Sequence, residues 1–251
     1  RIIFSFFIFM IPLNADFHWH LVEVTSGTQE LGISTLDIFL SFLYLSWFFR
    51  VVVEQKAGDI QWPSGGLLFT GFILWGALSM LNAREPLLSF FSVAMLIKSF
   101  LYYFYFANNI RTREDLWLVA RCLMAGLIVE SFIGFAQHAK GGNLGLAALG
   151  ERPIEKELAL SGETVYRIGG TLGHPNEFGG YLASLLPLTL ALNFTKSDKA
   201  SRLLSLAALF FGSVMMVLTL SRSAWYGLVI ALAVFLAWLV IFEKKRLPFV
   251  P

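Results

Sequence analysis

The feature that most constrains this 251-residue chain is a series of apolar runs, each close to the length of a membrane-spanning helix. A bilayer core about 30 Å thick needs about 20 helical residues, because each residue adds about 1.5 Å. The sequence predicts eight such segments, of which the first is too short to cross a bilayer alone. Their expected bounds are about 2–13, 33–53, 65–82, 87–107, 117–136, 177–194, 203–220 and 225–242.

The composition supports an all-α fold, a polytopic bundle of about eight membrane segments. Hydrophobic residues make up 57% of the chain and charged residues only 14%, whereas a soluble domain carries roughly 25% charged residues. We therefore expect lipid bilayer, not water, around most of the surface, and a single helical membrane domain over residues 1–251. The chain begins at Arg1 inside an apolar run and without a methionine, so we interpret it as a fragment or a processed form.

Several classes of function are disfavoured by the charged, cysteine and histidine residues. The formal net charge of +2 is too small for a nucleic-acid-binding surface. The single cysteine, Cys122, cannot form an internal disulfide framework. His18 and His20 have a metal-like spacing, but no matching carboxylate or cysteine cluster accompanies them. We therefore predict no nucleic-acid partner and no metal.

The orientation in the membrane is predicted from basic residues in short loops, which are enriched on the cytoplasmic side. The connection from Asn14 to Glu30 has no Lys or Arg and suits an outer loop. The opposite set of compact connections contains ten basic residues, so we place it in the cytoplasm together with both ends of the chain. These residues are Arg50, Lys56, Arg111, Arg113, Lys196, Lys199, Arg202, Lys244, Lys245 and Arg246.

The stretch 203–242 is interrupted only by Arg222 and a few small polar residues. One straight helix of about 40 residues would be about 60 Å long, twice the thickness of the hydrocarbon core. A hairpin that turns at 221–223 fits better, and it places Arg222 at the outer rim. Trp225 and Tyr226 then lie where an interfacial belt of aromatic residues is expected.

A first polar signature, RIGGTLGHPNEFGGYL, covers Arg167–Leu182. Pro175 and Asn176 indicate the start of a helix, with Asn176 as a suitable N-cap. The positive end of that helix dipole, together with Arg167, suits a phosphate or carboxylate. The alternative is that the glycines serve only close helix packing. Three glycines can adopt positive φ and let backbone approach a ligand: Gly169, Gly170 and Gly173.

A second signature, LTLSRSAWYG, has Arg222 at its centre. An arginine at the middle of a membrane helix costs about 2.5–3.5 kcal/mol on insertion scales, and less near an interface. The aliphatic part of the Arg222 side chain could lie against lipid while the guanidinium reaches the headgroups. That arrangement would need no functional explanation. The neighbouring hydroxyls of Thr219, Ser221 and Ser223 favour a polar anion site instead.

Other ionisable residues have weaker alternatives. Arg84, in a third outer turn, could join the basic cluster, although an ordinary loop arginine is the simpler interpretation. Glu177 suits a helix start, where the dipole favours carboxylates, and it is also a candidate base. His174 could carry protons near neutral pH or simply form a loop hydrogen bond. A pairing of Lys98 with Glu130 across helices is a further expectation for packing.

At the two signatures the chain resembles the O-antigen ligase/polymerase family of bacterial membrane proteins. The resembling patterns are R-x-x-G-T-x-x-H-P-N-E-x-G-x-Y-L at Arg167–Leu182 and T-x-S-R-S-A-W at Thr219–Trp225, within about 165–242. The resemblance implies a metal-independent inverting glycosyltransferase of the bacterial inner membrane, without cofactor. It implies a glycan donor linked to undecaprenyl diphosphate at the periplasmic face. The acceptor would be lipid A core or another glycan, so that the enzyme works as a ligase or a polymerase.

The resemblance also implies roles for individual residues, with Arg167 and Arg222 holding the leaving diphosphate. A further arginine and histidine of the family's ligases belong to a downstream periplasmic loop, beyond Pro251. Two other functions stay open: a transporter of a small anion such as bicarbonate, and a non-catalytic partner that binds carrier lipid. A transport site is usually near the membrane midplane within inverted repeats, which the sequence does not show. The predicted catalytic residues are Arg167, Arg222, Glu177 and His174, and the predicted substrate-binding residues are Gly170, Gly173, Asn176, Ser221, Ser223 and Arg84.

Overall fold

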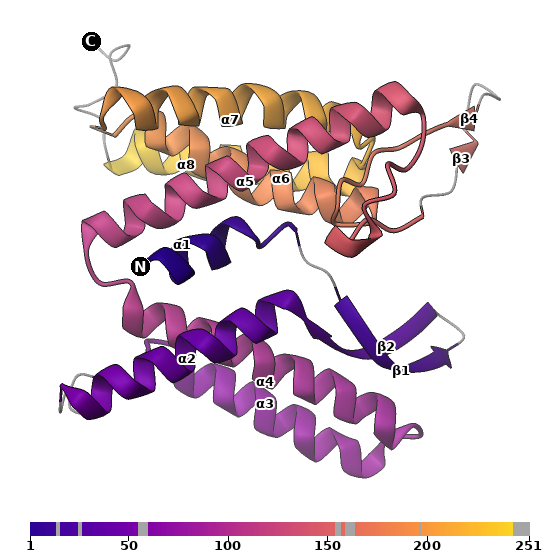
Figure 1. Cartoon of the computed structure of the whole chain (residues 1–251), viewed down its shortest axis with the longest axis vertical. Helices are drawn as coiled ribbons and strands as arrows, with labels where there is room; N and C mark the ends of the chain where they lie inside the picture. Colours follow the sequence, from indigo (N-terminus) through magenta and orange to yellow (C-terminus); the bar gives the residue numbers. More distant parts are fainter. Residues whose placement is uncertain are drawn as a thin grey trace. The chain divides into compact units, whose positions relative to one another are not determined.

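The computed structural model describes residues 1–13, 16–24, 27–54, 60–153, 157–158, 164–195 and 197–242. Their helices confirm the predicted all-α bundle, and each predicted segment coincides with one α-helix (Figure 1). Sequence and structure differ mainly at the helix ends; the fifth helix runs on to Lys140. The helices are α1 (Ile2–Phe9), α2 (Thr35–Val53), α3 (Gly66–Ser79), α4 (Pro86–Asn109), α5 (Arg113–Lys140), α6 (Pro175–Asn193), α7 (Lys199–Leu218) and α8 (Arg222–Phe242).

Short strands and 3-10 turns occupy parts of the connections. The stretch predicted as an outer loop contains β1 (Asp16–Val24) and β2 (Gly27–Ser34), which pair antiparallel with an irregular register between His18 and His20. Alternating apolar residues in DFHWHLVEV are typical of a strand, so the sequence does carry a signal for this hairpin. The remaining short elements are η2 (Met80–Asn82), η3 (Ala147–Leu149), β3 (Glu157–Leu158) and β4 (Thr164–Val165).

The helices form two compact units. Unit 1 consists of Arg1–Phe7 and Asp16–Leu118, and unit 2 consists of Ile8–Ala15 and Val119–Pro251. In unit 1, α3 packs against α4. In unit 2, α6 packs against both α7 and α8, and α7 and α8 are joined by a tight turn (Figure 1). Both predicted signatures belong to unit 2.

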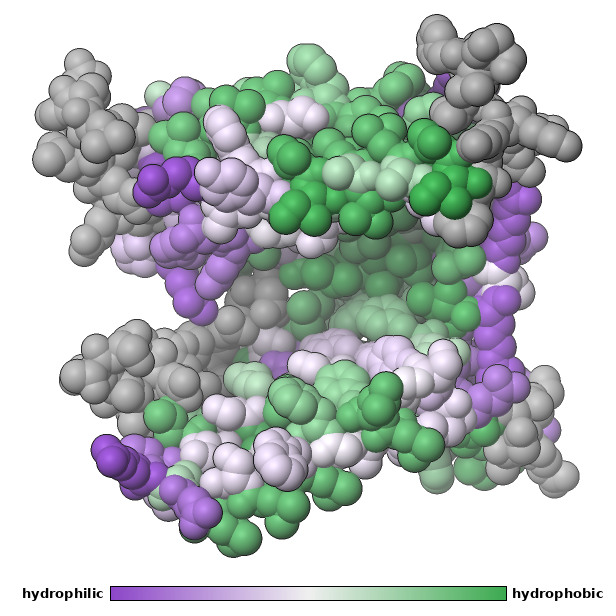
Figure 2. Space-filling view, turned by 180° about the vertical axis from the view of Figure 1, so that it is seen from behind, coloured by the Kyte–Doolittle hydropathy of each residue, from purple (hydrophilic) through white to green (hydrophobic). Residues whose placement is uncertain are grey.

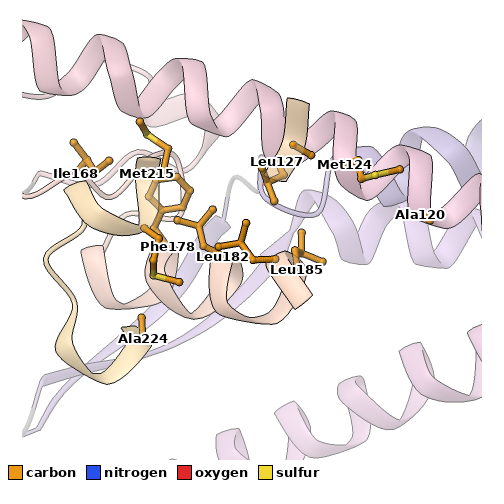
Figure 3. Packing of buried hydrophobic residues seen from close by; sticks show 12 residues of the cluster. Ala120, Met124, Leu127, Ile168, Phe178, Leu182, Leu185, Met215 and Ala224 are labelled. Atoms are coloured by element: carbon orange, nitrogen blue, oxygen red, sulfur yellow. The ribbon is translucent and has the colours of Figure 1, made fainter. Parts of the chain in front are cut away.

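The core of unit 2 gathers side chains from α5, α6 and α7 (Figure 3). Phe178 and Leu182, one helical turn apart on α6, and Met215 on α7 are fully buried. Ile168 fills the same cluster from the loop before α6, so the first signature is anchored through a side chain next to Arg167. Burial of such a side chain contributes about 1.5–3 kcal/mol.

The surface has the character expected of a membrane protein. Five of the described helices, α2, α4, α5, α7 and α8, are long and apolar enough to cross a membrane. Large apolar side chains are exposed on them, for example Val53 at 78% and Val229 at 65%. Figure 2 shows broad apolar surface in green, with hydrophilic side chains gathered toward the two sides of the view. In water this surface would be unfavourable, so the structure supports lipid around the helices.

An ion pair in unit 1 corrects one sequence-based expectation. Ser34 and Asp37 form a capping box at the start of α2, in which each side chain bonds the other's backbone N–H. Lys98 Nζ lies 2.6 Å from Asp37 Oδ2, and Tyr102 donates to Asp37 Oδ1 at 2.8 Å. The predicted pairing of Lys98 with Glu130 is therefore wrong, because Lys98 pairs with Asp37, a carboxylate of its own unit that the helix cap holds in place.

Two adjacent glycines of α6 test how closely the helices of unit 2 pack. A Cβ on Gly179 would lie 2.7 Å from the Cβ of Ala224, whereas a Cβ on Gly180 would have no atom within 4 Å. We expect Gly179→Ala to destabilise the protein by about 1–3 kcal/mol through overpacking. Gly180→Ala should stabilise it by up to about 1 kcal/mol through helix propensity. Thermal unfolding midpoints in one detergent check this, and equal midpoints for the two variants would contradict the packing.

Candidate functional site

The two signatures meet at one end of unit 2 through a set of hydrogen bonds that we call the arginine junction. Arg167 Nε donates to the carbonyl oxygen of Thr219 at 2.9 Å, and Arg167 Nη2 donates to Asn176 Oδ1 at 2.9 Å. Ser221 Oγ donates to the same Asn176 oxygen at 2.9 Å. The junction, made of these four residues, therefore ties the loop and start of α6 to the α7–α8 turn.

The α7–α8 turn lies slightly earlier in the chain than predicted. Helix α7 ends at Leu218 and α8 begins at Arg222, so the turn occupies the three residues between them instead of 221–223. Leu220 has φ 51°, a left-handed conformation that costs a non-glycine residue about 1–2 kcal/mol. The Arg167 bond to Thr219 and a bond from Trp225 Nε1 to the carbonyl of Met216 at 2.9 Å hold this turn.

Arg222 is the exposed cation of this region. Its side chain is exposed at the first residue of α8, and no described residue forms a hydrogen bond or ion pair with it. Ser223, also exposed, has its hydroxyl 3.2 Å from that of Ser221, so it continues the polar surface beyond the junction. The structure thus brings Arg222, Ser221 and Ser223 to the end of the bundle where Arg167 is held.

The start of α6 differs in detail from the prediction. His174, not Asn176, is the N-cap, and its Nδ1 accepts from the backbone N–H of Asn176 at 3.1 Å. Pro175 occupies the first turn as predicted. The N–H groups of Glu177 and Phe178 both donate to the carbonyl of His174 at 3.0 Å. These donors are engaged within the helix, so an anion here would meet side chains more than backbone N–H groups.

Two of the predicted glycines adopt the conformation that only glycine tolerates well. Gly170 has φ +61° and Gly173 has φ +85°. The space beside each is filled by the protein itself. A Cβ on Gly170 would collide with the carboxylate of Glu130, and a Cβ on Gly173 would lie 2.9 Å from Cδ of Arg152. These glycines therefore let two parts of the protein itself come close to the first signature. These parts are Glu130 of α5 and Arg152 of the loop that follows α5.

A buried polar network that the sequence analysis missed supports the first signature from α5. Gln137, fully buried, donates to the carbonyl of Gly170 at 3.0 Å and accepts from its N–H at 2.9 Å. Glu130, also fully buried, accepts from the N–H of Thr171 at 3.0 Å and bonds its hydroxyl. The same hydroxyl lies 2.8 Å from the carbonyl oxygen of Pro12, so its single proton is shared between two acceptors. Because Glu130 and Gln137 are seven residues apart, they share one face of the helix.

A second carboxylate organises the loop that follows α5. Glu151 accepts from the N–H groups of Leu144, Gly145 and Leu146 at 2.7, 2.7 and 2.6 Å. It also accepts from Gln137 Nε2 at 2.7 Å, which links this loop to the buried network. Burial raises the pKa of Glu151, but these hydrogen bonds to the charged form outweigh it and lower the pKa overall.

The remaining predicted site residues are distributed between the two units. His174 and Glu177 are exposed at the start of α6, beside the junction. Arg84 belongs to unit 1, in the turn between η2 and α4, and no described carboxylate lies within ion-pair distance of it. Within the described ranges, no group of three or more His, Cys, Asp or Glu residues is arranged to hold a metal ion.

Comparisons with known proteins do not assign the chain to a family. No protein-family model matches it, and no curated protein or solved structure is significantly similar to it. The geometry of the arginine junction is therefore the main basis for a functional proposal.

The lowered pKa of Glu151 predicts an acid-sensitive loop. A carboxylate with a folded pKa below its unfolded value stabilises the fold above the unfolded pKa, and this contribution is lost as pH falls through the folded pKa. Starting from the usual value of 4.5, stability should decline below about pH 4.5. Thermal unfolding midpoints against pH check this. In Glu151→Gln the midpoint should be lower at neutral pH and depend less on acid; an unchanged acid slope would contradict the role of Glu151.

Proposed function

We propose that the chain is a membrane-bound glycosyltransferase of the O-antigen ligase/polymerase type. It transfers or polymerises a glycan carried on undecaprenyl diphosphate, at the periplasmic face of the bacterial inner membrane. The observation that carries this proposal is the arginine junction, through which Arg167 holds the turn that presents Arg222. The apolar helices of membrane length support the lipid-linked substrate, because its carrier is itself a membrane lipid.

The contacts suggest different roles for the two arginines, direct contact with the substrate for one and positioning for the other. Arg222 is exposed and has no described partner, so it contacts the diphosphate directly. Arg167 bonds Thr219 and Asn176, so it positions the turn and adds a fixed positive charge. A departing glycosyl diphosphate develops multiple negative charge, and pre-placed cations lower the barrier electrostatically. The planar guanidinium fork can bind two phosphate oxygens at once, which a lysine cannot.

Two exposed side chains beside the junction, Glu177 and His174, accept and donate protons in the proposed reaction. The acceptor hydroxyl of lipid A core or of another glycan attacks the anomeric carbon from the face opposite the diphosphate. The bond from that carbon to the diphosphate oxygen breaks, and the diphosphate leaves with the electron pair. The side-chain carboxylate of Glu177, exposed and without a described hydrogen-bond or ion-pair partner, receives the hydroxyl proton. His174 accepts the Asn176 N–H through Nδ1, so its neutral ring carries a proton on Nε2 and can donate to substrate.

The direct test replaces Arg222 by alanine in the full-length protein. We expect glycan transfer to fall at least about 100-fold, the effect of removing one pre-placed donor from a developing anion. Membrane levels should stay normal, because the side chain is exposed and forms no described hydrogen bond or ion pair. Lipopolysaccharide or exopolysaccharide banding on gels reports transfer. Arg167→Ala should also abolish transfer while membrane levels stay normal, and its lost junction bonds should show only as a lower unfolding midpoint in detergent.

Arg202→Ala is the matched control for Arg222→Ala. Arg202 is an exposed arginine in the first turn of α7, at the opposite end of that helix from the junction. Its replacement should leave transfer unchanged. Normal banding in Arg222→Ala would contradict the transferase proposal. Normal banding combined with a loss of bicarbonate uptake would indicate anion transport at the same arginine instead.

A further inference from the structure

Unit 1 contains a cavity of about 1050 Å³ that the proposed transferase reaction does not use. It lies between the start of α1, the last turns of α2 and α4, and the beginning of α5. The helices α2, α4 and α5 are each long and apolar enough to cross a membrane. A cavity at the ends of such helices lies at the depth of lipid headgroups, not at the centre of the bilayer.

The polar lining of the cavity carries an excess of positive charge. Three arginines line it, Arg1, Arg50 and Arg111, against two carboxylates, Glu54 and Asp115. Asp115 already has partners of its own. Its carboxylate accepts from the hydroxyl and the N–H of Thr112 and lies 3.6 Å from a guanidinium nitrogen of Arg1. No described residue forms a hydrogen bond or ion pair with the guanidinium of Arg50, whose backbone carbonyl accepts from the N–H of Glu54. The guanidinium charge is therefore available to an anion that enters the cavity.

The apolar lining forms an aromatic wall beside Arg50. The rings of Trp47 and Tyr105 meet edge to face with centroids 6.0 Å apart, and Tyr105 is only 4% exposed. Asn108 fixes the rim, because its side chain bonds both the N–H and the carbonyl of Gln61 at 2.8 and 3.0 Å. The cavity therefore combines a guanidinium with a rigid apolar wall, which suits an amphiphile better than a free inorganic ion.

We propose that this cavity binds an anionic membrane phospholipid, with the phosphate against Arg50 and the glycerol and upper acyl chain against Trp47 and Tyr105. Basic pockets between membrane helices are suited to anionic headgroups, and the guanidinium fork matches phosphate oxygens. The outward face of α2 beside the cavity exposes Phe48 and Val52 at 61% and 55%, which provides a surface for the acyl chains. The site is independent of the glycosyltransferase proposal.

Native mass spectrometry of the purified chain in detergent micelles tests the site. Phosphatidylglycerol is the anionic probe, and phosphatidylcholine is the zwitterionic comparison. We expect phosphatidylglycerol to be retained preferentially, and Arg50→Gln to weaken its binding about fivefold. Arg113→Gln is the matched control, because Arg113 is an exposed arginine at the same helix ends but does not line the cavity. It should bind phosphatidylglycerol like the unmodified chain.

Two results would overturn the proposal without relying on the variant. Equal retention of the two lipids by the unmodified chain would remove the role of the anionic charge. Displacement of phosphatidylglycerol by an equal concentration of glycerol 3-phosphate would show that a soluble phosphate ester is the ligand and not a lipid. Unchanged phosphatidylglycerol binding in Arg50→Gln would exclude the guanidinium as the phosphate contact. The unfolding midpoint of each variant confirms that it is folded.

Discussion

The organisation of the signature end of unit 2 depends on one partly exposed interaction, in which the guanidinium of Arg167 donates to the carbonyl oxygen of Thr219 and to the side-chain oxygen of Asn176. Hydrogen bonds to a charged donor contribute about 1.5–3 kcal/mol each, more than neutral ones. Here they hold a turn that contains the left-handed Leu220, a conformation that needs support from its surroundings. The same turn sets the first residue of α8, so the position of Arg222 follows from the Arg167 contacts.

The support for Arg167 extends into the core through α5. Gln137 pairs with both backbone groups of Gly170, and Glu130 pairs with Thr171. Buried polar groups that satisfy one another in this way fix a single backbone arrangement, because any shift would leave a partner without its hydrogen bond. Loop residues only three or four positions from Arg167 are thereby held rigidly, which is the condition for a pre-organised anion site.

The helices and the polar signatures could be predicted from sequence. Membrane helices are recognised by apolar runs of about 20 residues, and polar residues inside such runs are rare enough to stand out. The hairpin turn was predicted within two residues from length alone. The partners could not be predicted. Lys98 pairs with Asp37 and not with Glu130. The capping box at the start of α2 holds the Asp37 carboxylate in place, and the charge of Lys98 is taken up there. The seven-residue spacing of Glu130 and Gln137 was a visible signal of a shared buried face, but their partners lie in a loop without periodicity.

The central claim is that the two signatures form one structure, and a double-mutant cycle measures it most directly. Asn176 belongs to the first signature and Ser221 to the second, and their side chains are hydrogen-bonded at 2.9 Å. Free energies of unfolding in detergent would be compared for Asn176→Ala, Ser221→Ala and the double variant. The structure predicts a coupling of at least about 0.5 kcal/mol. Additive effects, within about 0.3 kcal/mol, would show that the signatures are energetically separate and would contradict the shared site.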